Sequence, residues 1–576
     1  MYQQILDPVA GSLAWSSLVA AVPLIVLFVL LGILRMTAWL AALISLAVAL
    51  AVAIFVYPMP AGPAFLAAAE GAAFGFFPIL WIVINAIWIY NMTVHTGHFD
   101  VLRRSFSRVS DDQRIQGVIV AFSFGALLEA LAGFGTPVAI TSVMLIALGF
   151  RPLKAAVVAL VANTAPVAFG ALAVPITTLA TVTGLPLHDL SAMVGRQTPL
   201  LGFVVPLALV FIIDGTRGVR QTWPVALVCG VVFAVAQFAI SNYVSAPLTD
   251  IVASLLSAGA VVLFLRFWRP VEGFTETGGP EVTRTGAGAD GRAEAAATST
   301  ATIDRQAPRA GRDGPPSGGG DGDTEAGRRD SGAEVFRAYS PYLIIIVVFG
   351  LAQIPAIQHA LTSVTRTFAW PGLHITSASG KVSTLPMFKF DWLAAAGTLL
   401  IIAGLLTIPV IRIRPATALR IYFATYRQLA PAIVTVMAVL ALAYVMNASG
   451  QTTTLGTWMA GAGGIFALIS PILGWLGVAV TGSDTSSNSL FGALQVVAAQ
   501  KAELSATLLA AANSSGGVLG KMISPQNLAI AAAAVGMSGR EGDLFRRVFL
   551  WSVLFLAVMC VLVYLQSTAV LSWMVP

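Results

Sequence analysis

Charged residues are scarce in this sequence. They make up only 10% of its 576 residues, whereas soluble globular domains carry roughly 25%. Cysteine and histidine are also rare, at two and five residues. Cys229 and Cys560 both lie in apolar segments, and no two histidines have the spacing of a metal site. The composition excludes an ordinary soluble domain and predicts neither a disulfide framework nor a metal centre.

The sequence also lacks the motifs of familiar enzymes and of targeting segments. Nothing matches HExxH or GxSxG, and GGVLGK (516–521) departs from the P-loop pattern at Ser515 and Met522. The start, MYQQILDPVAGSLAWSSL, has no basic stretch before a short apolar core, so no cleaved signal peptide is expected. The net charge of +6 is small and dispersed, which argues against a nucleic-acid partner. We therefore predict that the protein is not an enzyme and needs no cofactor.

What the sequence does contain is long apolar runs. Hydrophobic residues make up 57% of the chain, and the mean hydropathy is +0.86. The runs are about 20 residues long, enough for a helix to cross roughly 30 Å of hydrocarbon. We predict an all-α, multi-pass protein of the plasma (inner) membrane, surrounded by lipid. The expected crossings are 18–34, 38–57, 64–94, 155–184, 197–213, 224–242, 249–267, 341–355, 391–411, 429–447, 504–535 and 545–565.

Two further apolar stretches, 115–149 and 465–500, are interrupted by GFGTP (133–137) and TGSDTSSN (481–488). Basic loops mark the cytoplasmic side of a membrane protein. The basic residues of this chain fall on one side only if each of these two stretches enters and leaves by the same face. Both are therefore predicted to be re-entrant hairpins, which accompany about 12 crossings.

This arrangement predicts an inverted repeat, a common plan for secondary transporters. The first repeat covers 1–215 and the second covers 338–576, with a connecting pair of crossings at 216–269. Between them, 270–337 is rich in Gly, Ala and Pro and holds 8 Arg and 12 acidic residues, which predicts a disordered cytoplasmic linker.

Matching motifs support the repeat. ANTAPVAFGALAVP (162–175) and ANSSGGVLGKMISP (512–525) share Asn, Gly and Pro at the same spacing. The alternative is chance, since small residues are common in membrane helices.

Four backbone breaks are expected near the membrane midplane, at GFGTP, NTAPVAFG, TGSDTSSN and NSSGGVLGK. Helix ends leave N–H groups unpaired and carry a partial positive charge at the N-terminus, which attracts an anion. Glycines at the breaks allow close backbone approach, and short polar side chains suit a small acid that carries a hydroxyl. The predicted substrate-binding residues are Gly133, Gly135, Thr136, Asn163, Thr164, Ser483, Thr485, Ser486, Ser487, Asn488, Asn513, Ser514, Ser515 and Lys521.

Ionisable groups near the breaks are candidates for proton coupling. Glu129 and Asp484 are the main ones, and Glu70 is a weaker one, because a buried carboxyl resists ionisation and can carry a proton. Lys521 is expected to pair with a substrate carboxylate. The alternative is a structural ion pair of Lys521 with Asp484 or Glu129 that only holds the hairpins, and Glu70 equally fits a structural role.

Four segments resemble the lactate permease family: LLEALAGFGTPVAI (127–140), GFRPLKAAVVALVANTAPVAFGALAVPI (149–176), TGSDTSSNSLFGALQ (481–495) and ANSSGGVLGKMISPQNLAIAAAAVG (512–536). The resemblance extends over nearly the whole chain, although the linker is longer and more polar than expected. It implies a carrier that takes up L-lactate, D-lactate and glycolate together with H⁺.

Three alternatives remain at this point. A sodium-coupled carboxylate symporter fits because hydroxyls and Asp484 also suit Na⁺, and a membrane-embedded enzyme or a passive channel would use the same buried polar centre. The sequence leaves a homo-oligomer open and does not distinguish rocking from sliding motion.

Overall fold

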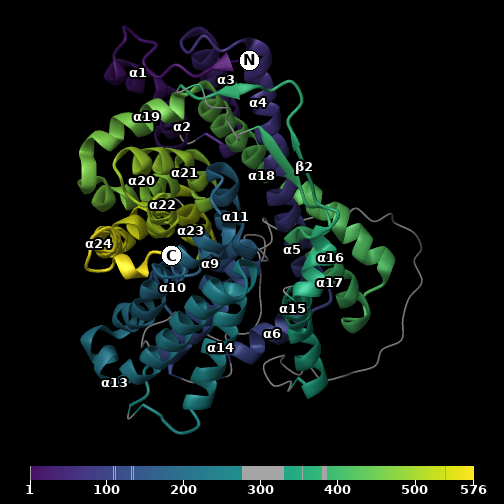
Figure 1. Cartoon of the computed structure of the whole chain (residues 1–576). Coiled ribbons are helices and arrows are strands. Elements are labelled where there is room, and N and C mark those ends of the chain that lie inside the picture. Colours follow the sequence, from purple (N-terminus) through teal and green to yellow (C-terminus); the bar gives the residue numbers. More distant parts are fainter. Residues whose placement is uncertain are drawn as a thin grey trace, which may run out of the picture.

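The computed structural model describes residues 2–34, 36–107, 109–110, 112–131, 133, 135–270, 272–275, 330–352, 354–378, 380, 386–538 and 540–576. These residues are mostly helical (Figure 1). Ten helical segments among them are long and apolar enough to cross a membrane, and four shorter apolar helices accompany them. The chain is therefore an all-α polytopic membrane protein, with four short strands among the described residues.

The elements follow one another along the chain with short connections. The N-terminal part holds β1 (Tyr2–Gln3), α1 (Leu13–Ala20), α2 (Val22–Phe28), η1 (Val29–Ile33), α3 (Ala38–Phe55), α4 (Ala61–Phe74), η2 (Gly75–Leu80), α5 (Trp81–His95) and α6 (His98–Ser107). Next come α7 (Gln113–Gln116), η3 (Gly117–Phe124), α8 (Gly125–Leu131), α9 (Thr136–Ala147), α10 (Pro152–Ala162), α11 (Gly170–Thr183), α12 (Leu187–Val194), α13 (Pro199–Tyr243), η4 (Ala246–Leu248) and α14 (Thr249–Phe264).

The second half begins with α15 (Gly332–Ala352), α16 (Pro355–Thr362), β2 (Arg366–Ala369), β3 (Ile375–Thr376), β4 (Met387–Phe390), α17 (Ala396–Val410) and α18 (Pro415–Ser449). It continues with α19 (Gln451–Met459), η6 (Ala460–Ile465), α20 (Phe466–Thr481), α21 (Asp484–Lys501), α22 (Ala506–Gly520), η7 (Lys521–Ile523), α23 (Pro525–Ala534), α24 (Glu541–Gln566) and η8 (Ser572–Met574). Within α13, non-helical dihedral angles at Asp214 and Gly215 divide the segment into two helices.

The two halves of the chain are packed into each other. On one side α3, α4 and α5 pack against α17 and α18, and on the other α9, α10 and α11 pack against α21 to α23 (Figure 1). Small residues also permit close packing within the second half, as is common in membrane helices. A Cβ added at Gly474 of α20 would lie only 1.8 Å from the carbonyl oxygen of Asn513 in α22, and one added at Gly516 only 2.1 Å from that of Pro471. The helix backbones therefore touch.

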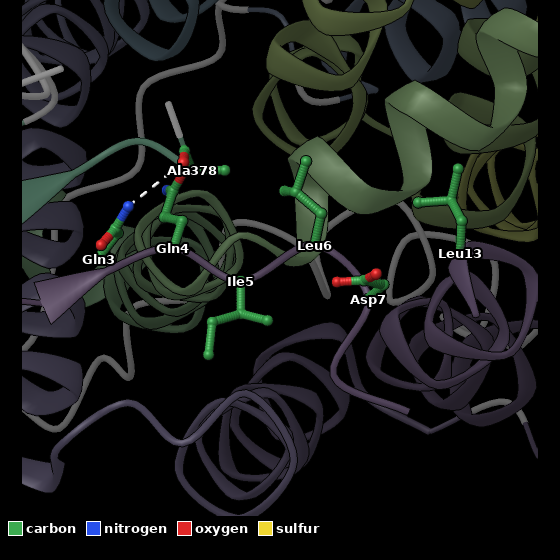
Figure 2. Close-up of a pocket in the computed structure, with 7 residues that line it drawn as sticks. All are labelled: Gln3, Gln4, Ile5, Leu6, Asp7, Leu13 and Ala378. Carbon is green, nitrogen blue, oxygen red and sulfur yellow. Dashed lines mark hydrogen bonds between the residues drawn. The ribbon is translucent and has the colours of Figure 1, made fainter. Parts of the chain in front are cut away.

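Short strands connect the N-terminus to the second half. β1 pairs in parallel with β3, with Tyr2 opposite Ile375, and β2 pairs antiparallel with β4. The Tyr2 hydroxyl lies 2.7 Å from the carbonyl oxygen of Tyr57, within hydrogen-bonding distance. An open hollow of about 640 Å³ lies along this N-terminal segment and is lined by Gln3, Gln4, Ile5, Leu6, Asp7, Leu13 and Ala378 (Figure 2). None of the residues predicted for substrate or proton binding lines it.

Three of the four predicted backbone breaks are found where expected, and the fourth is displaced. Helix α22 runs unbroken through NSSGGVLG, so the predicted break at 513–521 is wrong in position. The side chains of Asn513 and Ser514 bond to Asn488 and Asp484 of α21 instead of their own backbone. The helix gives way at Lys521–Ser524, because Pro525 disfavours a helical conformation in the residue before it.

The predicted linker falls mostly outside the described residues, since 276–329 are not among them. At its end the structure differs from the prediction, because α15 begins at Gly332 and residues 332–337 are helical. The Ser331 hydroxyl accepts a hydrogen bond from the Glu334 amide, a typical helix-start interaction.

Candidate functional site

Three of the four helix breaks have clear local causes. Between α8 and α9, Gly133 and Gly135 have φ values of 50° and 82°, and between α20 and α21 Gly482 has a φ of 75°. Glycine adopts this left-handed region at little cost. Pro137 and Pro525 stand at the starts of α9 and α23, where a proline ring is already compatible with the helix. Glycine and proline therefore set where the helices stop and restart.

A small cavity lies where the four breaks meet. Its volume is about 60 Å³. A buried water needs roughly 10–15 Å³ on the same measure, so the cavity suits a molecule of only a few heavy atoms. The lining residues come from every break and from both halves of the chain: Glu129, Gly133, Val167, Gly170, Ala171, Val174, Pro175, Gly482, Ser483, Asp484, Thr485, Lys521 and Gln526.

A buried ion pair forms one wall of this cavity. The Lys521 Nζ lies 2.5 Å from Glu129 Oε1, and both side chains are almost fully buried. Asn163 donates from Nδ2 to the other oxygen, Glu129 Oε2, at 2.9 Å. Gly170 leaves room for the carboxyl, because a Cβ there would lie 2.8 Å from Glu129 Oε1. Each charge depends on the other, since an unpaired charge is costly to bury.

Asp484 lies on the opposite side of the pair, in the first turn of α21. Its Oδ2 accepts a hydrogen bond of 2.5 Å from the Ser514 hydroxyl. Its Oδ1 is buried and has no hydrogen-bond partner among the described residues. Gly517 of α22 makes space for that oxygen, because a Cβ would approach it to 2.4 Å. Asp484 therefore presents a carboxyl oxygen without a partner beside the positive end of a helix.

An amide network fixes the orientation of α21. Asn488 donates to the carbonyl oxygen of Pro175 at 3.1 Å, and Asn513 donates to Asn488 Oδ1 at 2.9 Å. The Ser483 hydroxyl accepts from the Ser486 amide and caps the helix. The amides of Asp484 and Thr485 have no acceptor within the helix and lie at the cavity. These two N–H groups at the N-terminal end of α21 can therefore donate hydrogen bonds to an anion.

The sequence-predicted residues divide into three groups. Those that line the cavity are Glu129, Gly133, Ser483, Asp484, Thr485 and Lys521. Those that hold its walls through hydrogen bonds are Asn163, Ser486, Ser487, Asn488, Asn513 and Ser514. Those that the structure does not bring to the cavity lining are Gly135, Thr136, Thr164, Ser515 and Glu70.

Glu70 is separate from this cavity. It lies in α4, which packs against α18, and its side chain is completely buried. Both carboxyl oxygens lack a hydrogen-bond partner among the described residues, although Tyr444 is close enough to interact with it electrostatically. The structure therefore places Glu70 in the helix packing and not at an exposed interface.

Sequence reasoning missed Gln526, Gly170 and the apolar lining at Val167 and Val174. Gln526 follows Pro525, at which α23 begins. A polar residue directly after a helix-starting proline in apolar sequence is the signal that could have indicated it. Gly170 and the valines carry no chemical motif. Only the fold shows that they face Glu129 and Lys521.

Comparisons with known proteins agree over the full chain. A family model described as L-lactate permease matches residues 16–570. The L-lactate permease of Bacillus subtilis is 40% identical over 595 residues, covering 100% of both chains. The glycolate permease GlcA of Escherichia coli is 43% identical and covers 97% of this chain and 96% of its own. The L-lactate permease of Escherichia coli is 40% identical over 100% of both.

A solved structure, that of the YdaH transporter of Alcanivorax borkumensis, covers 86% of each chain with a TM-score of 0.42 and 15% identity. That likeness is too weak to assign a topology.

Proposed function

We propose a function from one premise: the chain belongs to the L-lactate permease family, whose model it matches over residues 16–570. It is a multi-pass protein of the plasma membrane. The proposed activity is secondary active uptake of L-lactate and related small 2-hydroxy monocarboxylates, D-lactate and glycolate, by symport with a proton. The relatives named as L-lactate and glycolate permeases support this choice of substrates.

The buried Lys521–Glu129 pair at the cavity is the observation that carries the proposal. An incoming carboxylate needs a cation, and Lys521 Nζ has three N–H donors, of which one is used by Glu129. The amides at the start of α21 supply further donors. The substrate carboxylate therefore binds between Lys521 and the N-terminal end of α21, and its hydroxyl meets Ser483, Thr485 or Gln526.

Proton coupling follows from the same pair. When the substrate carboxylate binds Lys521, Glu129 loses its counterion and takes up a proton, because a lone buried carboxylate is costly. The net charge of the site is then the same with and without substrate. Proton and substrate each favour the binding of the other, which is the reciprocal linkage that symport needs. Asp484, with one oxygen unpartnered, is the second carboxyl that takes part.

The proposed architecture has about 12 crossings, two re-entrant hairpins and an inverted repeat. In support, α8 contacts α9 and α20 contacts α21, as the two arms of a hairpin would. The helices α9, α10, α11 and α23 are short, and broken backbone inside a membrane is tolerated only where protein or substrate satisfies it. Alternating access then exposes the cavity to each side in turn.

Uptake into proteoliposomes tests the proposal. We expect labelled L-lactate to accumulate when the outside is acidic, with or without Na⁺, and to be recovered chemically unaltered. Unlabelled D-lactate and glycolate should compete. Accumulation that requires Na⁺ and does not depend on the pH gradient would show that Na⁺ is the coupling ion. Equilibration down the L-lactate gradient without accumulation would indicate a channel.

A further inference from the structure

Asp250 is a further buried carboxyl that does not line the cavity. It occupies the first turn of α14 and is completely buried. Its Oδ1 accepts a hydrogen bond of 2.9 Å from Gln237 Nε2 on α13. Its Oδ2 has no hydrogen-bond partner among the described residues. A carboxylate held by one neutral donor is expensive to bury, so the neutral acid is the form that this pocket favours.

The break between α10 and α11 joins Asp250 to the cavity. Gln237 Nε2 also reaches the carbonyl oxygen of Ala165, at 3.5 Å. Two residues earlier in the same break, Asn163 donates to Glu129. Asp250 is close enough to Glu129 for the two carboxyls to repel each other when both are charged. Within residues 163–165, Asn163 therefore bonds to Glu129 directly, and Ala165 is linked to Asp250 through Gln237.

Polar groups with unused hydrogen-bonding capacity lie along this break. The Thr164 hydroxyl and Asn163 Oδ1 are both buried and lack a partner among the described residues. A hydroxyl can both accept and donate a proton, which is the property that a relay requires. Together with Asp250 Oδ2, these atoms are three buried polar groups whose hydrogen-bonding capacity is not used by the described residues.

The described basic side chains on the helices around α14 do not pair with Asp250 in the structure. Helix α14 packs against α8, α11, α13, η3 and η4. The ionisable side chains on those elements are Glu129 on α8 and Asp214, Arg217, Arg220, Cys229 and Tyr243 on α13. Arg220 lies about 25 Å along the helix from Gln237, at a rise of about 1.5 Å per residue. Among the described groups, Glu129 is the carboxyl with which Asp250 interacts.

We propose that Asp250 is a second proton-binding site, which passes its proton to Glu129 along residues 163–165. This inference rests on the proposed proton symport. The step requires the Thr164 hydroxyl, which has no partner among the described residues, to form hydrogen bonds with both carboxyls. The Asp250 O–H bond then breaks, the hydroxyl accepts that proton and releases its own, and an O–H bond forms on the Glu129 carboxylate. Asp250 is left as a carboxylate and is neutralised by the next proton.

The test compares Asp250→Asn with Asp189→Asn in proteoliposomes. Asparagine keeps an acceptor for Gln237 but cannot release a proton, whereas Asp189 is a partly exposed residue of α12. Two rates are measured for each protein: accumulation of labelled L-lactate driven by a pH gradient, and exchange of labelled for unlabelled L-lactate without a gradient. For Asp250→Asn we expect the ratio of accumulation to exchange to fall by about tenfold or more. For Asp189→Asn we expect the wild-type ratio.

A wild-type ratio in Asp250→Asn would overturn the assignment of Asp250, and so would an equal loss of both rates in folded protein. A wild-type protein that ignores the pH gradient would instead overturn the proposed function. If Asp250→Asn does not fold, Thr164→Val makes the same comparison with a side chain of the same shape, and a normal ratio there overturns the relay. Asp250→Glu is expected to restore accumulation with an altered pH profile.

Discussion

Lys521 and Glu129 are 392 residues apart in the sequence and 2.5 Å apart in the structure. One comes from the second half of the chain and the other from the first, and both are buried at one cavity. The pair therefore holds the halves together and provides the site with a cation and a carboxyl that can exchange partners. Several consequences of this arrangement can be measured.

Replacing Glu129 by Gln removes the proposed proton carrier but keeps an oxygen near Lys521. We expect accumulation of L-lactate against its gradient to fall by about tenfold or more, because substrate binding no longer depends on a proton. Exchange of internal for external L-lactate separates coupling from binding. Accumulation at the wild-type level in Glu129→Gln would show that this carboxyl is not coupled to transport.

Replacing Lys521 by Met leaves Glu129 buried without its counterion. Removing one partner of a buried pair typically costs about 3–5 kcal/mol, so we expect a clear loss of thermal stability in detergent. The double variant with Glu129→Gln should recover much of that loss, because no lone charge remains. Thermal unfolding of the two single variants and the double variant measures this coupling. Additive effects would mean that the two side chains do not stabilise each other.

Substitutions at and beside Asp484 test the role of the second carboxyl of the cavity. We expect Asp484→Asn to abolish accumulation of L-lactate, because it removes the ionisable carboxyl beside Lys521 and the N-terminal end of α21. Ser514→Ala is the matched variant, since it removes only the hydrogen bond to Asp484 Oδ2. Its loss of accumulation should be smaller, because Asn488 still donates to Asp484 Oδ2 at 3.4 Å. The lost hydrogen bond should lower the stability by about 1–3 kcal/mol. Normal accumulation by Asp484→Asn would exclude this residue from coupling.

The contact between α20 and α22 depends on glycine. We expect Gly474→Ala to reduce the amount of folded protein strongly, because its Cβ would meet the Asn513 carbonyl oxygen at 1.8 Å. Gly259→Ala is the control, since a Cβ there has nothing within 4 Å, and alanine favours helix by about 1 kcal/mol. Size-exclusion profiles and melting temperatures distinguish the two. Equal stability of both variants would contradict the close packing.

A surface contact on the segment after α14 should depend on pH. Hydrogen bonds from Arg217 and Gln221 lower the pKa of Glu272 below its ordinary value of 4.5. A lowered pKa means that the contact is complete above 4.5 and is lost as the pH falls through the lowered value. A spin label at Gly273→Cys should therefore be equally restrained at pH 7 and pH 5 and become mobile in stronger acid. Release between pH 7 and pH 5 would contradict this ion pair.

The sequence predicts the breaks well where glycine and proline act locally. Gly135 with Pro137, and Gly482 before Asp484, mark helix ends by backbone preference alone, and the structure has those ends. The same reasoning fails at 513–520, because Asn513 and Ser514 bond to side chains of α21, which no local pattern reveals. The short strands that tie Tyr2 to Ile375 are too brief to leave a periodic signal.

For the candidate site, too, the sequence predicts which residues are unusual but not which of them lie in contact. Glu129, Asp484 and Lys521 stand out because ionisable residues are rare in apolar sequence. Which of them pair is decided by helix packing between the two halves, and the sequence left both pairings of Lys521 open. Asp250 was missed because it sits at the start of an expected crossing, where a polar residue usually faces water.

Simultaneous recording of proton and L-lactate entry into proteoliposomes tests the central claim most directly. With an inward proton gradient and no Na⁺, the wild-type protein should carry both inward together, and lactate added without a gradient should itself draw protons in. Lactate entry with no accompanying proton, or entry that begins only when Na⁺ is added, would contradict the account.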